Sequence, residues 1–297
     1  MKDINVDIWH VDDRNIDFLL NGNDTGYWKS FLESQNISHT VLIDDVQKAI
    51  EKEAALKISG SRKVNWDSYA QLADIYAYLK SKADAHPKNC ILRTIGKTNQ
   101  NKEIKMLKVT NGKIGNGAVL IEAGMHGREW LGVSSLLYFV ETITSNFNTQ
   151  PGYIRHKDWY IIPVANPDGY EYSMNKDRLW RKNRRRLSGQ CDGVDVSRNF
   201  DAFWGSKGAS PDTCANNYFG PYVFSEKESI AIRAMNGVHK MRNYKFNMNI
   251  KSIRGSGMAV DWAYQQGIQH SYLIESRSRY FQVDLGLGLG FRTITHC

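Results

Sequence analysis

The spacing of hydrophobic residues changes near residue 60, and this change divides the chain into two parts. In the first part, apolar and β-branched residues predict strands over residues 6–10 and 40–43, because such side chains favour extended backbone. Apolar residues at helical spacing predict helices over 26–34 and 46–56. We therefore expect a small α+β module over residues 1–60.

Beyond residue 66, helical and strand-like segments alternate. Helical spacing predicts helices over 68–83, where Pro87 follows shortly after the end, and over 131–145. Short apolar runs predict strands at 91–95, 104–110, 118–123 and 159–164. The alternation favours an α/β domain over 66–297 with a mixed, mostly parallel sheet flanked by helices, in which sites gather at the carboxyl ends of strands.

Between these parts lies a small, polar and basic stretch, Lys-Ile-Ser-Gly-Ser-Arg-Lys at residues 57–63. Exposed segments of this composition are typical linkers and good targets for a trypsin-like protease. We place the linker and cleavage region at residues 61–65.

Composition and charge narrow the class of protein. The chain has 297 residues, of which 41% are apolar and 24% charged, as in globular proteins, and without a run of 18 apolar residues we expect no membrane span. The net charge of +8 is concentrated in residues 176–186. A nucleic-acid-binding arm is one interpretation, and we favour the other, a solvated loop in which one or two arginines face a site.

The cysteines and the first residues bear on whether the protein is secreted. Cys191 and Cys214 lie in a loop-rich stretch where a disulfide is compatible with the spacing, although spacing alone does not establish it. The glycosylation sequons at Asn23 and Asn36 matter only in a secreted protein. No signal peptide is visible, so we expect either that the protein is not secreted by the usual route or that the sequence lacks its true start.

The segment with the clearest chemistry is Gly-Met-His-Gly-Arg-Glu-Trp at residues 124–130, directly after a predicted strand. His126 and Glu129 are two good ligands for Zn²⁺, which needs a third protein ligand if its fourth position is to hold water. A lone His-x-x-Glu also occurs by chance as a buried histidine beside a surface glutamate. The strand end, the flanking glycines and the helix that follows favour the metal site.

Six segments in order resemble zinc-dependent carboxypeptidases of the A/B type: residues 126–130, 164–170, 178–182, 193–200, 261–264 and Glu275. Residues 1–60 resemble the activation segment of that family, including its Asp7-Ile-Trp9 strand. The resemblance implies a secreted, monomeric zymogen that binds one Zn²⁺ and hydrolyses the C-terminal peptide bond of peptides and proteins. Its implied partners are those C-termini and an activating trypsin-like protease, with no nucleic acid.

The resemblance also implies the catalytic roles. His126 and Glu129 would bind Zn²⁺, and Glu275 would be the general base that takes a proton from water. Arg181 would stabilise the developing oxyanion. Taken alone, Glu275 is more often a surface glutamate at a strand end, and an arginine is more often a solvated surface residue.

Substrate binding would fall to a second group of residues. Arg198 would hold the terminal carboxylate, with help from Arg128. Ser197 stands where the family usually has asparagine, so we expect weaker carboxylate binding. Val260 matches the base of the pocket for the terminal side chain and favours apolar or aromatic termini, unless it is an ordinary core valine.

The match to the family fails after Ile250. The third zinc ligand of the family is a histidine at the end of a strand that residues 245–250 resemble, but this chain continues directly into 251–257, which resembles the segment just before Asp261. No histidine lies between His239 and His270. Neither matches the ligand, and Ile253 stands where the family has a catalytic-site tyrosine.

The end of the chain also departs from the family. Of the residues that usually follow the glutamate, only Arg277 is kept, and residues 284–290 carry glycine at every second position, which suits neither helices nor strands. We therefore predict an internal deletion and an altered C-terminus, with weak zinc binding and poor turnover. The alternatives are a carboxypeptidase-like protein that binds C-termini without cleaving them, or a nucleic-acid binder that uses residues 176–186.

Overall fold

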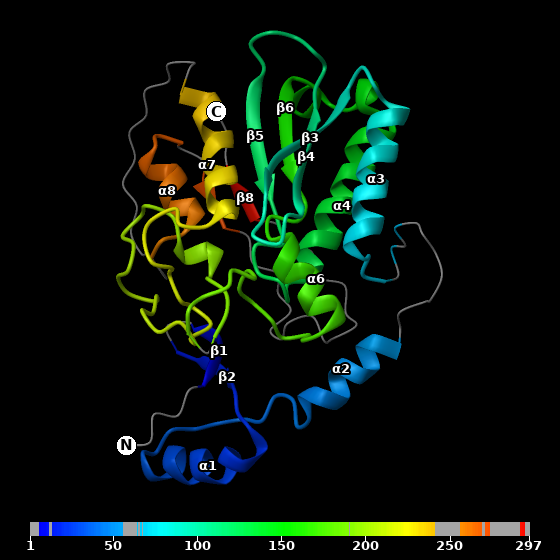
Figure 1. Ribbon diagram of the computed structural model, residues 1–297. Helices are drawn as coiled ribbons and strands as arrows, with labels where there is room; N and C mark the ends of the chain where they lie inside the picture. The colour runs from blue at the N-terminus through cyan, green and yellow to red at the C-terminus, as the bar shows by residue number, and fades with distance from the viewer. Residues whose placement is uncertain are drawn as a thin grey trace. The chain divides into compact units, whose positions relative to one another are not determined.

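The structure is a computed structural model that describes residues 6–11, 14–55, 64, 66, 68–189, 191–240, 256–268, 271–273 and 292–294 (Figure 1). The chain divides into two units. One comprises residues 1–58 with 278–286, and the other comprises residues 59–277 with 287–297.

The first unit contains two antiparallel strands and two helices. The strands are β1 (Asp7–Val11) and β2 (Ile16–Leu19), and a short 3₁₀ helix η1 (Gly22–Asp24), α1 (Thr25–Ser34) and α2 (Val46–Ala55) follow. Trp28 on α1 packs its ring against Phe18 of β2 and Phe31 one turn further along α1. The α+β character expected for this part of the chain is present.

The prediction of a strand over residues 40–43 is wrong. These residues form an irregular segment, and Val41 and Leu42 are 48% and 44% exposed. β-Branched side chains favour a strand only where a neighbouring strand supplies hydrogen bonds and a packing surface. In the described part of this unit, the ladder joins β1 to β2 and does not reach residues 40–43.

The second unit is built on a six-stranded sheet with the order β3-β4-β6-β5-β8-β7. Its strands are β3 (Cys90–Lys97), β4 (Glu103–Val109), β5 (Gly117–Glu122), β6 (Lys157–Ile162), β7 (Ser271–Tyr272) and β8 (Arg292–Ile294). The four strands predicted between residues 91 and 164 correspond to β3, β4, β5 and β6. β7 and β8 complete the described sheet.

The mixed α/β sheet flanked by helices is confirmed, but its described ladders are not mostly parallel. β5 and β6 run parallel, whereas each of the other four described ladders is antiparallel. The reason is clearest at β3 and β4, which are joined by a tight turn closed by a hydrogen bond from Thr98 N to Lys102 O (2.8 Å). A connection this short can join only antiparallel neighbours.

Helices cover both faces of the sheet (Figure 1). On one face lie α3 (Leu72–Ala85) and α4 (Trp130–Ser145), and on the other lie α7 (Lys227–Lys240) and α8 (Ala259–Gln265). Side chains alternate along each strand, so Val119 and Ile121 of β5 belong to the core under α3 and α4, whereas Leu120 belongs to the core under α7 and α8. The sheet is therefore buried on both sides.

Residues 166–169 begin a helix, although their sequence Asn-Pro-Asp-Gly is also typical of a turn. In α6 (Pro167–Asn175), Asn166 is the N-cap and its Oδ1 accepts from Gly169 N (2.9 Å), while proline occupies the first helical position. The residues that favour a turn also favour a helix start. The remaining short elements are η2 (Phe147–Thr149), α5 (Gly152–Arg155) and η3 (Val196–Arg198). Among the described helices, none combines the length and apolar character needed to cross a membrane.

Two buried glutamates lie at the start of α7. Glu226 accepts from Arg185 NH1 (2.7 Å) and Asn183 Nδ2 (2.7 Å), and Glu228 accepts from the same Asn183 Nδ2 (3.1 Å). Both residues have no exposed surface. Burial raises the pKa of Glu228 to about 7, with a smaller contribution from the neighbouring charge of Glu226.

We expect Glu228→Gln to stabilise the protein at alkaline pH. Because the pKa of Glu228 in the folded state lies above its ordinary 4.5, wild-type stability is fully present at low pH and falls as the pH rises through about 7. The variant avoids this loss, so urea unfolding at pH 8 should show a gain of up to about 3 kcal/mol that is absent at pH 4. Exposed Glu33→Gln is the matched control, and an equal gain at both pH values would contradict the prediction.

Candidate active site

His126 and Glu129 lie together at the carboxyl end of β5. The strand ends at Glu122, and Glu129 is the N-cap of α4, so a short loop carries both side chains. His126 is 1% exposed, and its Nδ1 lies 2.6 Å from Oε1 of Glu129. An unprotonated Nδ1 and a carboxylate are both acceptors, so at this distance they require a proton or a cation between them.

The carboxylate of Asp195 lies on the Nε2 side of His126 and connects this histidine to Arg181. Its Oδ2 accepts from Nε and NH2 of Arg181 (3.0 and 2.8 Å), and its Oδ1 lies 3.2 Å from Nε2 of His126. Burial acts to raise the pKa of Asp195, but the positive charge of Arg181 and the hydrogen bond with His126 hold that pKa well below its ordinary range. Asp195 is therefore an ionised, fully buried carboxylate with charged partners.

The importance of Asp195 was not recognised from the sequence. A signal was available, because Asp195 stands inside the segment 193–200 that resembles the family, two residues before Ser197. Histidines that bind metals commonly give their second ring nitrogen to a carboxylate, which fixes the tautomer and orients the ring. A search for such a carboxylate partner of His126 would have favoured Asp195, the acidic residue of the segment 193–200.

Two glycines allow three segments to meet at the site. A Cβ atom on Gly127 would lie 2.3 Å from the carbonyl oxygen of Gly169 and 2.8 Å from that of Trp180, and Gly127 N donates to Arg181 O (3.0 Å). A Cβ atom on Gly169 would lie 2.5 Å from Lys182 O. The loop that carries His126, the start of α6 and the segment that carries Arg181 can approach this closely only without side chains there.

The predicted substrate-binding arginines have different surroundings. Arg198 donates through Nε to Gly208 O (2.9 Å) and through NH1 to the carbonyl oxygen and Oγ of Ser197 (3.1 and 3.0 Å). Ser197 in turn lies 2.8 Å from Nε2 of His126. Arg128 is 1% exposed and donates to Leu179 O (3.2 Å). The structure thus brings Arg181, Ser197 and Arg198 together with the histidine, whereas Arg128 lies in the interior.

Val260 lies beside this group, in the first turn of α8. It lines a small pocket together with Ser197 and with Glu122, Met258, Ala259, Tyr272 and Leu273. Val260 and Ser197, predicted separately from the sequence, therefore line the same pocket. The wall that α8 contributes is apolar.

The donor set fits zinc only in part. Nδ1 of His126 and the carboxylate of Glu129 are suitable ligands, and Asp195 supports the histidine as metal sites require. Within the described ranges, however, no group of three or more His, Cys, Asp or Glu side chains could hold a metal ion. Glu275, His270, Ile253, Arg277 and the segment 245–250 all lie outside the described residues.

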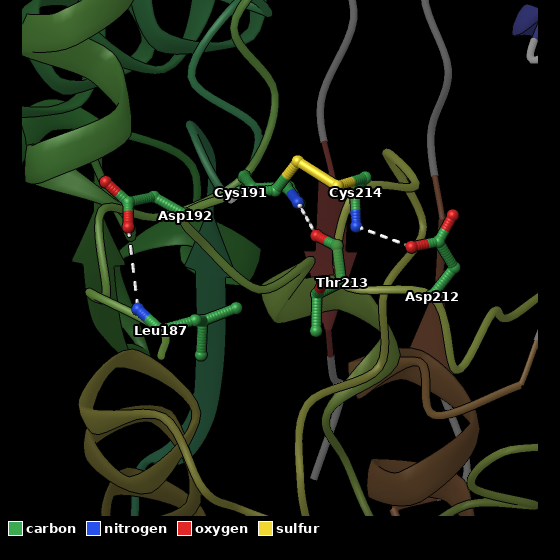
Figure 2. Close-up of a disulfide and its surroundings, with 7 residues drawn as sticks. Leu187, Cys191, Asp192, Asp212, Thr213 and Cys214 are labelled. Atoms are coloured by element: carbon green, nitrogen blue, oxygen red, sulfur yellow. Dashed lines mark hydrogen bonds between the residues drawn. A yellow bond between two sulfur atoms is a disulfide. The ribbon is translucent and has the colours of Figure 1, made fainter. Parts of the chain in front are cut away.

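The disulfide compatible with the sequence is present. Cys191 and Cys214 are bonded, with their Cα atoms 5.1 Å apart, and Figure 2 shows the bond between the loops that carry Asp192 and Asp212. Next to it, Nζ of Lys182 donates to Thr213 O (2.6 Å). Burial lowers the pKa of this lysine to about 8. The disulfide loop therefore packs against the residue that follows Arg181.

The basic segment 176–186 is less solvated than we expected. Arg178 lies 3.6 Å above the ring of Trp130, and Arg184 lies 3.9 Å above the ring of Tyr172 and 4.3 Å above that of Trp180. Arg178 and Lys182 are only 8% and 3% exposed. Because several of these cations stack on aromatic rings or lie in the interior, the segment contributes to packing, and a nucleic-acid-binding arm is disfavoured.

We expect Asp195→Asn to destabilise the protein strongly. The substitution removes a buried charge and leaves the guanidinium of Arg181 without its carboxylate partner, which typically costs about 3 kcal/mol or more. Urea unfolding measures the change. Asp201→Asn, at an exposed position nearby in the chain, is the matched control, and similar stabilities of the two variants would show that the Asp195 contacts contribute little.

Two family descriptions match this chain. Residues 75–253 match the zinc carboxypeptidase family, and residues 1–53 match the carboxypeptidase activation peptide. Zinc carboxypeptidase A 1 of Anopheles gambiae is 35% identical over 214 residues, which cover 71% of this chain and 49% of the relative. Carboxypeptidase A2 of Mus musculus is 28% identical over 306 residues, covering 84% of this chain and 73% of the relative. The chain thus spans about half the length of the mosquito relative.

Solved structures agree on the fold. The crystal structure of carboxypeptidase A from Helicoverpa armigera has a TM-score of 0.73 and 28% identity, covering 82% of this chain and 64% of that one. The crystal structure of thrombin activatable fibrinolysis inhibitor has a TM-score of 0.79 over 94% of this chain and 86% of that one, and at 24% identity it supports the fold alone.

Proposed function

This chain belongs to the zinc carboxypeptidase family, and we propose that it recognises the C-terminal residue of a peptide, whose last peptide bond the family hydrolyses. The observation that carries the proposal is the single hydrogen-bonded cluster formed by His126, Glu129, Arg181, Ser197 and Arg198 around Asp195. The cluster contains two side chains that are suited to binding a metal and, beside them, two guanidinium groups. That combination suits an anionic peptide end next to a reacting carbonyl.

In the proposed reaction, the residues of the cluster have separate roles. Zinc, when bound, supplies polarisation of the carbonyl and a more acidic water, and His126 and Glu129 would hold it. Arg198 would receive the terminal carboxylate. Arg181, fixed by Asp195 and with NH1 3.8 Å from Oε1 of Glu129, is positioned to face negative charge that develops near the metal ligands. For Glu275 the role of general base stays a prediction, as does substrate binding by Arg128.

We propose a preference for apolar or aromatic C-terminal residues. Met258, Ala259 and Val260 offer an apolar wall to the pocket beside Ser197. A cationic terminal side chain would be desolvated against this wall, and the carboxylate that lines the same pocket, that of Glu122, belongs to β5 and not to the wall where Val260 stands. Val260 at the wall thus favours A-type over B-type substrates.

We further propose that the chain, as its sequence stands, hydrolyses such substrates slowly and binds zinc weakly. The match to the family ends at residue 253, close to the junction after Ile250 where the third ligand is missing from the sequence. The alignment with mouse carboxypeptidase A2 is 306 positions long, but it covers 84% of the 297 residues of this chain. The mouse protein therefore carries sequence that has no counterpart here. Both facts support an internal deletion.

The organisation of the precursor is part of the same proposal. Residues 1–60 would form the activation segment, and a trypsin-like protease would cut at 61–65 to release a secreted, monomeric catalytic domain over 66–297. The match of residues 1–53 to the activation peptide supports the first part. Residues 61–63 and 65 lie outside the described residues.

An alternative is binding of C-termini without cleavage. It is favoured by the fact that Arg181 and Arg198 both lie in the hydrogen-bonded cluster around Asp195, whereas the described residues include two of the zinc ligands expected from the family. A peptide ending in Phe that binds with metal removed and is recovered intact would support this alternative. Release of C-terminal Phe that depends on added zinc would support hydrolysis.

We expect the purified chain to retain less than one zinc ion after dialysis, and His126→Ala to retain still less, because a histidine and a carboxylate leave the ion short of protein ligands. Metal analysis by mass spectrometry measures the content. His156→Ala, an exposed histidine elsewhere in the same unit, is the control and should match the wild type. Stoichiometric zinc in the wild type, together with rapid release of C-terminal Phe, would overturn the proposal of an impaired enzyme.

We expect Arg198→Gln to lose the preference for a free carboxylate. Wild-type protein should bind N-acetyl-phenylalanine more tightly than its amide, because a guanidinium forms two charge-assisted hydrogen bonds to a carboxylate; the loss should be about tenfold or more in affinity. Calorimetry of both ligands measures the ratio. Arg186→Gln, an exposed arginine of the basic segment 176–186, should keep the preference. An unchanged ratio in Arg198→Gln would rule out this role.

A further inference from the structure

Ser197 occupies the centre of the site instead of its edge. The residue is 1% exposed, and its hydroxyl oxygen has three partners in hydrogen-bonding range. These are Oδ1 of Asp195 at 2.8 Å, Nε2 of His126 at 2.8 Å and NH1 of Arg198 at 3.0 Å. A residue that only contacted a substrate carboxylate would face the pocket with its hydroxyl free. Here the hydroxyl joins two parts of the site.

The hydrogen-bonding capacity of a hydroxyl determines how these three contacts are made. A hydroxyl has one proton to donate and two lone pairs to accept with. Arg198 can only donate, and the ionised Asp195 can only accept, so the proton of Ser197 points to Asp195 and one lone pair receives Arg198. The second lone pair is left for His126, whose Nε2 must therefore carry a hydrogen.

This assignment has a consequence for His126. With hydrogen on Nε2, the nitrogen that faces Glu129 is Nδ1, and in the neutral ring Nδ1 has a lone pair available for a cation. Ser197 and Asp195 together hold the ring in that tautomer, because both present acceptors to Nε2. The serine thus acts on the metal-binding nitrogen through the opposite side of the ring.

The contacts of Arg198 connect this arrangement to substrate. Its Nε donates to Gly208 O, and its NH1 donates to both oxygens of Ser197. A carboxylate that binds a guanidinium in two-pronged fashion takes two neighbouring N–H groups. At least one of these hydrogen bonds must therefore be exchanged when a peptide C-terminus binds, and the 3.0 Å bond to the Ser197 hydroxyl is one candidate.

We propose that Ser197 is a positioning residue that transmits carboxylate binding at Arg198 to the imidazole of His126. When Arg198 turns to the carboxylate, the hydroxyl loses one donor and accepts more strongly from the hydrogen on Nε2. The inference rests on the proposed function, since it takes Arg198 as the group that receives the carboxylate. It goes beyond that function because it assigns a link between the two halves of the site.

Nuclear magnetic resonance of the full chain, labelled with ¹⁵N-histidine and kept in EDTA, tests the link without any metal-dependent activity. We expect the Nε2 signal of His126 to be that of a protonated nitrogen. On addition of N-acetyl-phenylalanine the attached proton should shift downfield, and the amide of the same compound should leave it in place. The shift should be lost in Ser197→Ala and kept in Ser197→Thr, which retains the hydroxyl.

A merely structural role for Ser197 would change stability in Ser197→Ala but would not remove a ligand-dependent shift. If Ser197→Ala does not fold, Ser197→Cys, whose thiol is a weaker hydrogen-bonding group of similar shape, should reduce the shift. A shift of the same size without the hydroxyl, with binding retained, overturns the link and leaves the proposed function standing. Failure of wild-type protein to bind N-acetyl-phenylalanine at all overturns both.

Discussion

The site depends on one buried negative charge, that of Asp195. A carboxylate removed from water must have strong partners, and here each oxygen has its own set. One oxygen binds the guanidinium of Arg181 and the other faces His126 and Ser197. The requirement to satisfy this single group therefore constrains the positions of Arg181, His126 and the hydroxyl of Ser197. Few other arrangements of these side chains would leave the charge fully paired.

The charge can be satisfied only because the backbone segments around it lie unusually close together. Gly127 and Gly169 provide this closeness, since a methyl group at either position would overlap main-chain atoms of a neighbouring segment. Substitution there would act on Arg181 and His126 at once, because both residues lie on the segments that these glycines bring together. Packing against aromatic rings, as for Arg178 on Trp130, then holds the same segments from outside the site. Electrostatics and close packing are in this way parts of one constraint.

Local patterns predicted the elements of the second unit well, because its helices and strands bury regular apolar faces such as that of Val119 and Ile121. They failed where the outcome depends on a distant partner. Residues 40–43 lack a neighbouring strand in the described structure, and Asn166 serves as a helix cap although it also suits a turn. His126, Glu129 and the arginines were visible as motifs. Asp195 was missed because its role exists only through contacts with residues far away in the sequence, which spacing along the chain does not reveal.

The pairing of β8 with β5 bears on how the protein is made. Leu120–Glu122, which lead into the loop that carries His126, pair on one side with β6 and on the other with residues 292–294. During synthesis on the ribosome, β5 and β6 emerge well before β8 does. Until then one edge of β5 lacks its partner, and an open edge can pair with another chain. Closure of such a distant contact is also slow. The edge of β5 that leads to the site is thus, together with β7, among the last parts of the described sheet to find a partner.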